Sequence, residues 1–375
     1  MPTLNDILKK DITREIEGVV KADDSRRIAQ EISEYVITRE ISKLLRRLFE
    51  GYQEAAARRV QGAEEVYPYN GVWISGYFGS GKSHLLKILA YLMSGEADEE
   101  LRATFLEKIK DEWLRGAVEA AFRVPSRSVL FNIDQQADAE PDDPRQVILL
   151  VFEKVFNRAL GYCDDDPVIA DFERDLDERG ELDEFKAVFQ ETAGESWESR
   201  RDAVMTIDRK LFLSAWTRFK GESESEANTL LDHYDSSRSL TAEKFAKRVA
   251  GWLDRQDTGD QRVNFYVDEV GQFVANRRDQ MLNLQTVAET LATVCENRAW
   301  VFVTSQEDLD SVIGDANQEQ RNDFSRITAR FYFRLALTSA NVEEVIQERL
   351  LAKKEEGAAL LHDYYTNEAD HIRTL

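Results

Sequence analysis

The stretch that decides the fold joins a short apolar strand to a glycine-rich turn and a helix, and it reads Val72-Trp73-Ile74-Ser75-Gly76-Tyr77-Phe78-Gly79-Ser80-Gly81-Lys82-Ser83. Its last eight residues form a complete G-x-x-x-x-G-K-[ST] motif, the Walker A motif. The glycines let the backbone adopt positive φ angles, so that successive N–H groups point inward, and the helix that begins near Ser83 adds the positive end of its dipole. The stretch therefore predicts a loop that binds a polyphosphate.

Each residue of this loop has an expected role. Lys82 is expected to contact the β- and γ-phosphates, and the Ser83 hydroxyl to ligate Mg²⁺. For His84, which follows directly, contact with the ligand is one interpretation and a packed or solvent-facing position is the other. The residues expected to bind the ligand are Gly76, Tyr77, Phe78, Gly79, Ser80, Gly81, Lys82, Ser83 and His84.

Further apolar segments alternate with helical patterns along the chain. Strands are expected at residues 72–75, 129–134, 263–267, 299–304 and 331–337. Apolar residues at three- and four-residue steps predict helix over residues 1 to about 60, with Gly51 as the weak point, and almost continuously from 143 to about 257. This alternation predicts an α/β fold with a parallel sheet. The expected organisation is an N-terminal helical segment (1–60), a core (61–338) with a helical insertion (about 140–258), and a further helical segment (339–375).

Two carboxylates follow the apolar strand expected at 263–267. Asp268 at the tip of the strand would hold the Mg²⁺ shell, and Glu269 would orient and polarise the water that attacks the γ-phosphate, as a general base. Paired acids at a strand end also occur in ordinary surface turns. The phosphate loop upstream favours the catalytic interpretation, and the glutamate favours hydrolysis over nucleotide binding alone.

Polar residues also follow the strand expected at 299–304. Ser305 or Gln306 could lie between the two carboxylates and the γ-phosphate, as a polar residue does on the adjacent strand in ATPases of this sheet type. A polar strand end is equally what an ordinary loop entry looks like, so both interpretations remain open.

Two arginines stand four residues apart before the last expected strand. Arg326 or Arg330 could reach the γ-phosphate of a neighbouring subunit and stabilise the charge of the transition state. The alternative is a pair of solvated or salt-bridged arginines.

Composition narrows the class of protein. The 375 residues include 49 Lys and Arg against 71 Asp and Glu, a net charge of −22 that opposes nonspecific attraction to DNA. Residues 164–198 alone carry 14 acidic and 3 basic residues, which suits a solvated helical face or a docking face for a basic partner. Two cysteines exclude a disulfide framework and favour a reducing cytoplasm. The sequence shows no signal peptide, no membrane-spanning stretch and no Cys/His metal motif.

The order of these elements resembles that of the AAA+ ATPases. The segment Arg326-Ile327-Thr328-Ala329-Arg330-Phe331 is similar to the arginine-finger region of initiator-type members. More narrowly, the chain resembles the large P-loop ATPase of the bacteriophage-exclusion (BREX) defence systems. The stretches that carry this resemblance are Ile16–Asp23, Glu34–Glu40, Ile74–Leu86, Val303–Leu309 and Leu337–Ile346.

The resemblance implies a Walker A and Walker B ATPase that uses ATP and Mg²⁺, oligomerises through arginine fingers and works with other phage-defence proteins. About 185 residues separate the loop from Asp268, so it also implies a large helical insertion, and it implies a helical lid that this chain holds only in part. A nucleotide-gated assembly scaffold with little turnover is an alternative. A DNA-translocating motor is another, with contacts made indirectly or by segments outside this chain.

Overall fold

The structure, a computed structural model, describes residues 3–11, 27–60, 69–137, 146–237, 239–274, 277–306, 308, 329–338 and 342–372. The chain divides into two compact units. We call residues 1–135 with 249–375 the sheet unit, and residues 136–248 the helical unit. Arg326 lies outside the described residues, so its predicted role as an arginine finger stays a prediction.

A five-stranded parallel sheet forms the centre of the sheet unit, in the order β2-β3-β4-β1-β5. The strands are β1 Gly71–Gly76, β2 Ser126–Asn132, β3 Arg262–Asp268, β4 Ala299–Ser305 and β5 Phe333–Leu337. The predicted α/β class with a parallel sheet is therefore confirmed. Because all pairs are parallel, the carboxyl ends of the strands lie at the same end of the sheet.

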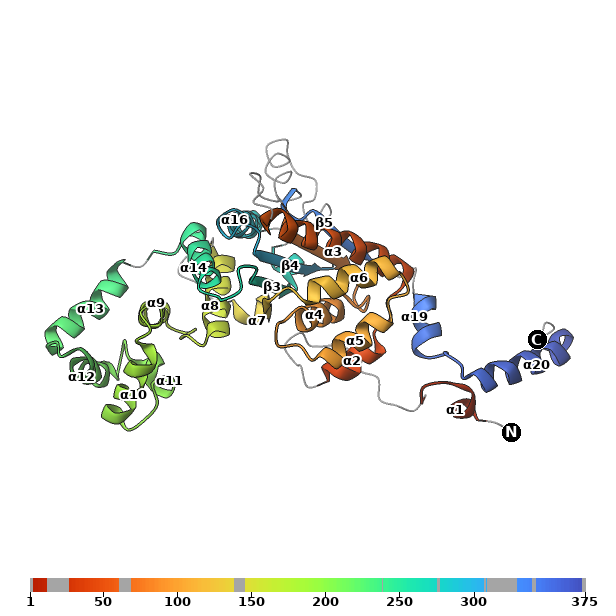
Figure 1. Cartoon of the computed structure of the whole chain (residues 1–375), viewed down its shortest axis with the longest axis horizontal. Coiled ribbons are helices and arrows are strands. Elements are labelled where there is room, and N and C mark those ends of the chain that lie inside the picture. Colours follow the sequence, from red (N-terminus) through yellow and green to blue (C-terminus); the bar gives the residue numbers. More distant parts are fainter. Residues whose placement is uncertain are drawn as a thin grey trace. The chain divides into compact units, whose positions relative to one another are not determined.

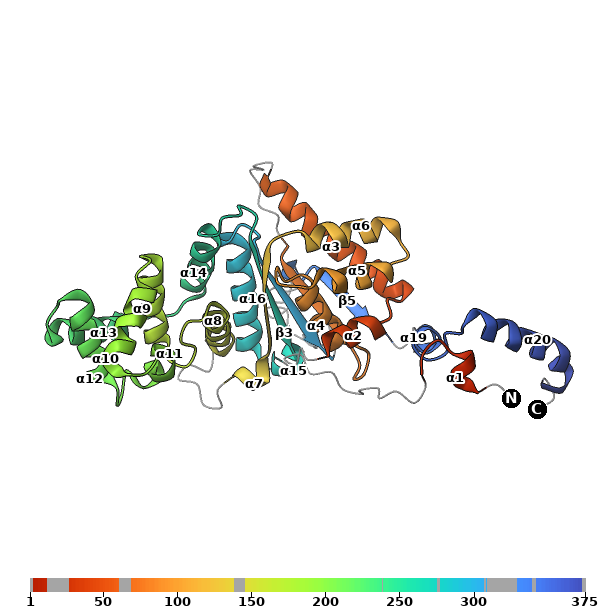
Figure 2. The ribbon, with the colours of Figure 1, turned by 60° about the horizontal axis from the view of Figure 1, so that its bottom comes forward.

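Helices cover both faces of this sheet. Figures 1 and 2 show α4 and α16 on opposite sides of β3 and β4. The described helices of this unit are α1 Leu4–Ile7, α2 Ile28–Glu34, α3 Arg39–Val60, α4 Lys82–Leu92, α5 Glu99–Glu107, α6 Glu112–Phe122, α7 Ile133–Gln136 at the border, α15 Val270–Val274, α16 Arg278–Val294, α19 Val342–Arg349 and α20 Glu355–Ile372. None of the helices in the described part of the chain is long and apolar enough to cross a membrane.

The main core lies between the sheet and helices α3 to α6. Trp300 and Phe302 alternate with residues of the other face along β4, and both join the cluster that holds Tyr52 and Leu89. These side chains are 0% exposed, and burial of a side chain such as Leu89 or Phe302 contributes about 1.5–3 kcal/mol. This packing fixes β1, β3 and β4, and therefore fixes the positions of whatever follows their carboxyl ends.

The predicted N-terminal helix is interrupted twice in the described part. α1 ends at Ile7, and Leu8 is extended. α2 ends at Glu34 and α3 begins at Arg39, whereas Gly51 lies inside α3. The second interruption contains Val36, Ile37 and Thr38, whose β-branched side chains lose rotamer freedom in a helix. The Thr38 hydroxyl instead accepts the Ile41 N–H at 3.3 Å and caps α3.

The helical unit has its own aromatic core. Its elements are α8 Val147–Leu160, α9 Pro167–Glu178, α10 Leu182–Ala193, α11 Trp197–Arg200, the 3₁₀ turn η2 Arg201–Ala203, α12 Arg209–Lys220, α13 Glu224–Ser237 and α14 Ala242–Asp254, which ends in the sheet unit. Phe185 packs edge to face against both Phe172 and Trp197, and the rings of Phe172 and Trp197 are tilted by 57° to each other. The buried Glu173 accepts the indole N–H of Trp197 at 2.6 Å and pairs with Arg201 at 2.9 Å, so its charge is compensated.

Candidate functional site

The predicted phosphate loop (residues 76–83) connects the carboxyl end of β1 to the first turn of α4. Gly79 and Gly81 have φ angles of 79° and 89°, a region that disfavours side chains. Gly76 is required for a different reason: an added Cβ would collide with Ser80 Oγ and stand 2.7 Å from the carbonyl oxygen of Leu337. The loop thus takes the turn that its glycines predict.

The side chains of the loop point in two directions. Tyr77 and Phe78 are 77% and 81% exposed, so they leave the inside of the loop to the backbone. The Ser80 hydroxyl is buried and has no hydrogen-bond partner within the described part of the chain. Helix α4 begins at Lys82 within the same loop, so the loop also contains the first N–H groups of the helix, which have no partner within a helix. Such a group of donors at a helix N-terminus suits an anion.

Lys82 and Ser83 bring the loop to the carboxylates on β3. The Ser83 hydroxyl donates to Asp268 Oδ1 at 3.0 Å, across 185 residues of sequence. Lys82 is only 8% exposed and interacts electrostatically with Asp268 and Glu269. Burial lowers the pKa of Lys82, and the two carboxylates act in the opposite direction by favouring its charged form. The structure therefore places all four predicted residues together.

Asp268 is the most buried of the four, at 5% exposure. Burial raises the pKa of this carboxyl, and hydrogen bonds from Thr304 and Ser83 act against the increase. Both hydroxyls donate to the same oxygen, Oδ1. The carboxylate is thus held in one orientation at the end of β3.

Glu269 is held by its backbone and by its side chain. Its φ is 63°, a left-handed value that is uncommon for a residue other than glycine. Its N–H donates to Thr304 Oγ1 at 2.8 Å, which keeps the backbone in this conformation. The Asn132 amide donates to Glu269 Oε2 at 2.8 Å from the end of β2. Asn132 on β2 therefore orients the carboxylate, and Thr304 on β4 holds the backbone that carries it.

Strand β4 lies between the loop strand β1 and the acidic strand β3, as the sequence suggested. The hydroxyl that meets Asp268 belongs to Thr304, one residue before the predicted Ser305. Ser305 is buried against α15, where an added Cβ on Gly271 would collide with it, and Gln306 is exposed. The polar position beside the carboxylates is therefore occupied by Thr304.

Sequence reasoning missed Asn132, Thr304 and Asp134. Asn132 and Thr304 are the polar ends of apolar strands, which is the signal that could have identified them. Asp134 follows β2, and burial together with the charge of Glu269 raises its pKa, against the effect of Arg277. Asp134 thus adds a third carboxylate near Glu269.

His84 belongs to a buried cluster behind the loop. Its ring meets Tyr35 edge to face, with 5.0 Å between centroids, and its Nε2 lies 3.9 Å from Glu31 Oε2. Burial lowers the pKa of His84 to about 4, and Arg349 and Lys87 add to the effect. The imidazole is therefore neutral at pH 7 and packs against α2 and the segment that follows it.

Arg330 stands before β5, and its carbonyl oxygen would lie 2.6 Å from a Cβ on Gly71. Gly71 begins β1, whereas the loop follows the other end of this strand. Arg330 therefore lies at the amino ends of the strands, and the loop lies at their carboxyl ends. Its guanidinium pairs with Glu289 of α16 at 2.6 Å. Within one copy of the chain, Arg330 does not reach the loop.

Replacing Thr304 by valine is expected to destabilise the protein by about 1–3 kcal/mol. Valine has the same shape but can neither donate to Asp268 nor accept the Glu269 N–H, so buried polar groups lose a partner. Urea unfolding measures the effect. The control is Thr286→Val, because this exposed hydroxyl only bonds the Leu282 carbonyl of its own helix. Equal midpoints for the two variants would contradict the role given to Thr304.

The sequence matches no protein-family model, and no solved structure matches the chain.

Proposed function

We propose that this chain binds ATP together with Mg²⁺ and hydrolyses it. The observation that carries the proposal is the contact of Ser83 with Asp268 at 3.0 Å, beside Lys82 and Glu269. A polyphosphate-binding loop, a buried lysine and two carboxylates are the parts that a P-loop nucleoside triphosphatase needs. On this proposal the parallel sheet is the core of a P-loop ATPase.

The donor set fits magnesium. Ser83 and Asp268 offer oxygen atoms, which hard cations prefer, and Mg²⁺ commonly takes its other ligands from water and substrate phosphates. No group of three or more His, Cys, Asp or Glu residues that could hold a metal alone occurs among the described residues. This is consistent with an ion that arrives with its nucleotide. When bound, Mg²⁺ would neutralise charge on the β- and γ-phosphates.

The residues of the chain then have separate roles. The N–H groups of the phosphate loop and α4 bind the phosphate oxygens, and Lys82 binds the β- and γ-phosphates. Glu269 Oε1 or Oε2 accepts a proton from the attacking water, while Asn132 holds that carboxylate and Thr304 holds the backbone N–H of the same residue. Asp268 keeps the Ser83 hydroxyl directed to the site.

Assembly is a further part of the proposal. Because Arg330 lies at the end of the sheet opposite to the loop of its own chain, any arginine finger at this position would act on a neighbouring copy, as the AAA+ resemblance implies. A place in a phage-defence complex is proposed from the BREX-like sequence stretches alone.

Nucleotide-dependent stabilisation tests the proposal. A ligand that binds only the folded state at 100 times its Kd raises the free energy of unfolding by about 2.7 kcal/mol. We therefore expect Mg²⁺ with ATP, but not Mg²⁺ alone, to shift the urea midpoint of the full chain upward and to release phosphate over time. Identical midpoints with and without ATP, and no phosphate release, would exclude the proposed function.

A further inference from the structure

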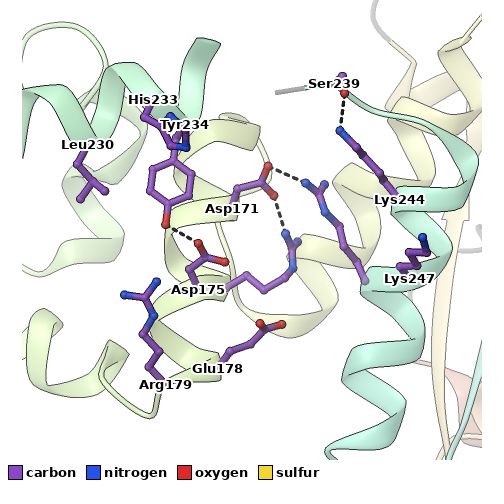
Figure 3. A pocket seen from close by; sticks show the side chains of 12 residues that line it. Asp171, Asp175, Glu178, Arg179, Leu230, His233, Tyr234, Ser239, Lys244 and Lys247 are labelled. Carbon is purple, nitrogen blue, oxygen red and sulfur yellow. Dashed lines mark hydrogen bonds and ion pairs between the residues drawn. The ribbon is translucent and has the colours of Figure 1, made fainter. Parts of the chain in front are cut away.

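The helical unit contains a cavity of about 670 Å³ that the proposed ATPase site does not use. It lies between α9, α13 and the first turns of α14, as Figure 3 shows. Its volume is within the range of about 300–1,000 Å³ that is typical of small-molecule sites. The residues that line it are Asp171, Arg174, Asp175, Glu178, Arg179, Leu230, His233, Tyr234, Ser239, Lys244, Lys247 and Arg248.

The charge of this lining is opposite to that of the unit around it. Residues 136–248 contain 16 Lys and Arg against 27 Asp and Glu, a net of −11. The cavity lining contains five Lys and Arg against three Asp and Glu. Positive side chains are therefore concentrated at this hollow of an acidic unit.

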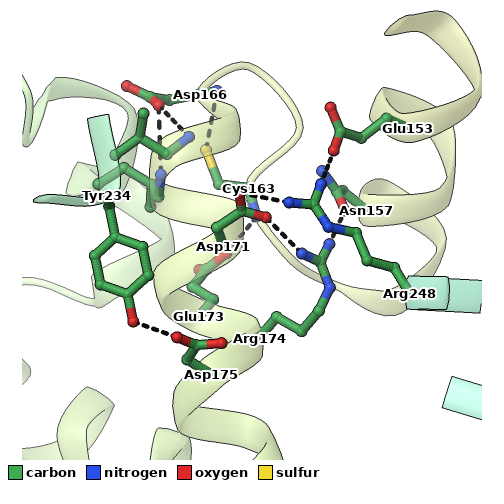
Figure 4. A network of polar contacts seen from close by, with 12 residues as sticks. Glu153, Asn157, Cys163, Asp166, Asp171, Glu173, Arg174, Asp175, Tyr234 and Arg248 are labelled. Carbon is green, nitrogen blue, oxygen red and sulfur yellow. Dashed lines mark hydrogen bonds and ion pairs between the residues drawn. The ribbon is translucent and has the colours of Figure 1, made fainter. Parts of the chain in front are cut away.

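Asp171 and Asp175, two of the lining carboxylates, accept hydrogen bonds from side chains of the same unit. Asp171 accepts from Arg174 at 2.6 Å and from Arg248 at 2.7 Å, and Asp175 accepts the Tyr234 hydroxyl at 2.5 Å. Figure 4 shows that Arg174 and Arg248 extend this network to Asn157 and Glu153 on α8. The network joins α8, α9 and α14 and gives the cavity a fixed wall. It also neutralises both of these arginines.

The remaining cations are available to a ligand. The Arg179 guanidinium makes no ion pair or hydrogen bond with the residues that the structure describes. Lys244 contacts the neutral Ser239 hydroxyl, and Lys247 pairs with Glu243 at 2.7 Å in an exposed i,i+4 contact of small energy. Figure 3 shows Arg179 on the α9 side of the space, and Lys244 and Lys247 on the α14 side.

We propose that this cavity binds a small phosphorylated molecule, whose phosphate oxygens are held by Arg179 from one side and by Lys244 and Lys247 from the other. A guanidinium fork and two ammonium groups match a dianion better than a single carboxylate. A small ligand is favoured over nucleic acid, because the net negative charge of the unit repels a polyanion that extends beyond the cavity.

Pyrophosphate tests this site separately from the ATPase site. The protein is the full chain carrying Lys82→Ala, in EDTA, so that the phosphate loop and Mg²⁺ make no contribution. Isothermal titration at 0.15 M salt is expected to show saturable binding with one site per chain. Exchanging Arg179 and Lys247 for glutamate is expected to weaken binding by at least about tenfold, since charge-assisted hydrogen bonds are lost.

The control exchanges Lys210 and Arg218 of α12, exposed cations outside this cavity, for glutamate, and it should bind as the parent does. Glutamine at 179 and 247 gives the same comparison without charge reversal, in case the glutamate variant does not fold. No saturable binding by the parent would overturn the proposal, as would equal affinities of the cavity and control variants. Neither result would affect the ATPase proposal, which rests on Lys82 and Mg²⁺.

Discussion

Glutamine in place of Glu269 is expected to slow ATP hydrolysis by at least about 100-fold and to leave ATP binding intact. The amide cannot accept the proton of the attacking water. It has nearly the same size, and its carbonyl oxygen can still accept the hydrogen bond from Asn132. A lower kcat therefore reports the loss of proton transfer and not the collapse of the site. Phosphate release under saturating Mg²⁺ and ATP measures it.

The matched control for this variant is Glu224→Gln on α13, an exposed glutamate of the helical unit. This variant also removes one negative charge, but at a residue of the helical unit and not beside Asp268 and Glu269. It should hydrolyse ATP at the rate of the unmodified chain. If Glu269→Gln also kept that rate, the assignment of Glu269 as general base would be wrong, and another group would have to accept the proton.

Alanine in place of Lys82 is expected to abolish ATP binding at micromolar nucleotide, a loss of at least about 100-fold in affinity. A charge-assisted hydrogen bond contributes about 1.5–3 kcal/mol, and Lys82 is expected to make one to each of two phosphates. The side chain is 8% exposed beside Asp268 and Glu269, so its removal also leaves two carboxylates facing the incoming anion. Equilibrium binding of a fluorescent ATP analogue with Mg²⁺ measures the change.

Two further variants make this result specific. Lys210→Ala removes an exposed lysine of α12 and should leave the affinity unchanged. Lys82→Met keeps the length of the side chain and should bind as weakly as Lys82→Ala, because the charge and not the volume contacts the phosphates. Retention of affinity by either Lys82 variant would mean that the loop does not bind the nucleotide through this residue.

The strands of the sheet could be predicted because most of them are buried on both faces. Every residue of β3 and β4 is buried, so apolar residues predominate in both strands, even though β3 includes the polar Asn264. Strand β2 is an edge strand and begins earlier than predicted, at Ser126, because the polar residues of an edge strand do not produce an apolar run. It also ends earlier than the predicted residue 134, at Asn132, because α7 begins at Ile133. The proximity of the two carboxylates to the loop could also be predicted, since the carboxyl ends of parallel strands lie at the same end of a sheet.

The partners of these carboxylates depend on strand register, which no local pattern specifies. Val267 pairs with Val303, so the residue beside Asp268 on β4 is Thr304, and Asn132 pairs with Asp268 on the other side. A shift of one residue would have put Ser305 there instead. The interruption after α2 was hidden for a related reason: Val36 and Ile37 fit an apolar helical stripe as well as an extended segment.

The close approach of Gly271 to Ser305 sets a limit on redesign of this site. Any replacement at residue 271, even alanine, would force α15 away from the end of β4 and take the turn that carries Glu269 with it. Libraries that aim to alter turnover or nucleotide preference should therefore leave codon 271 fixed and place their diversity at Tyr77 and Phe78, whose side chains already project into solvent.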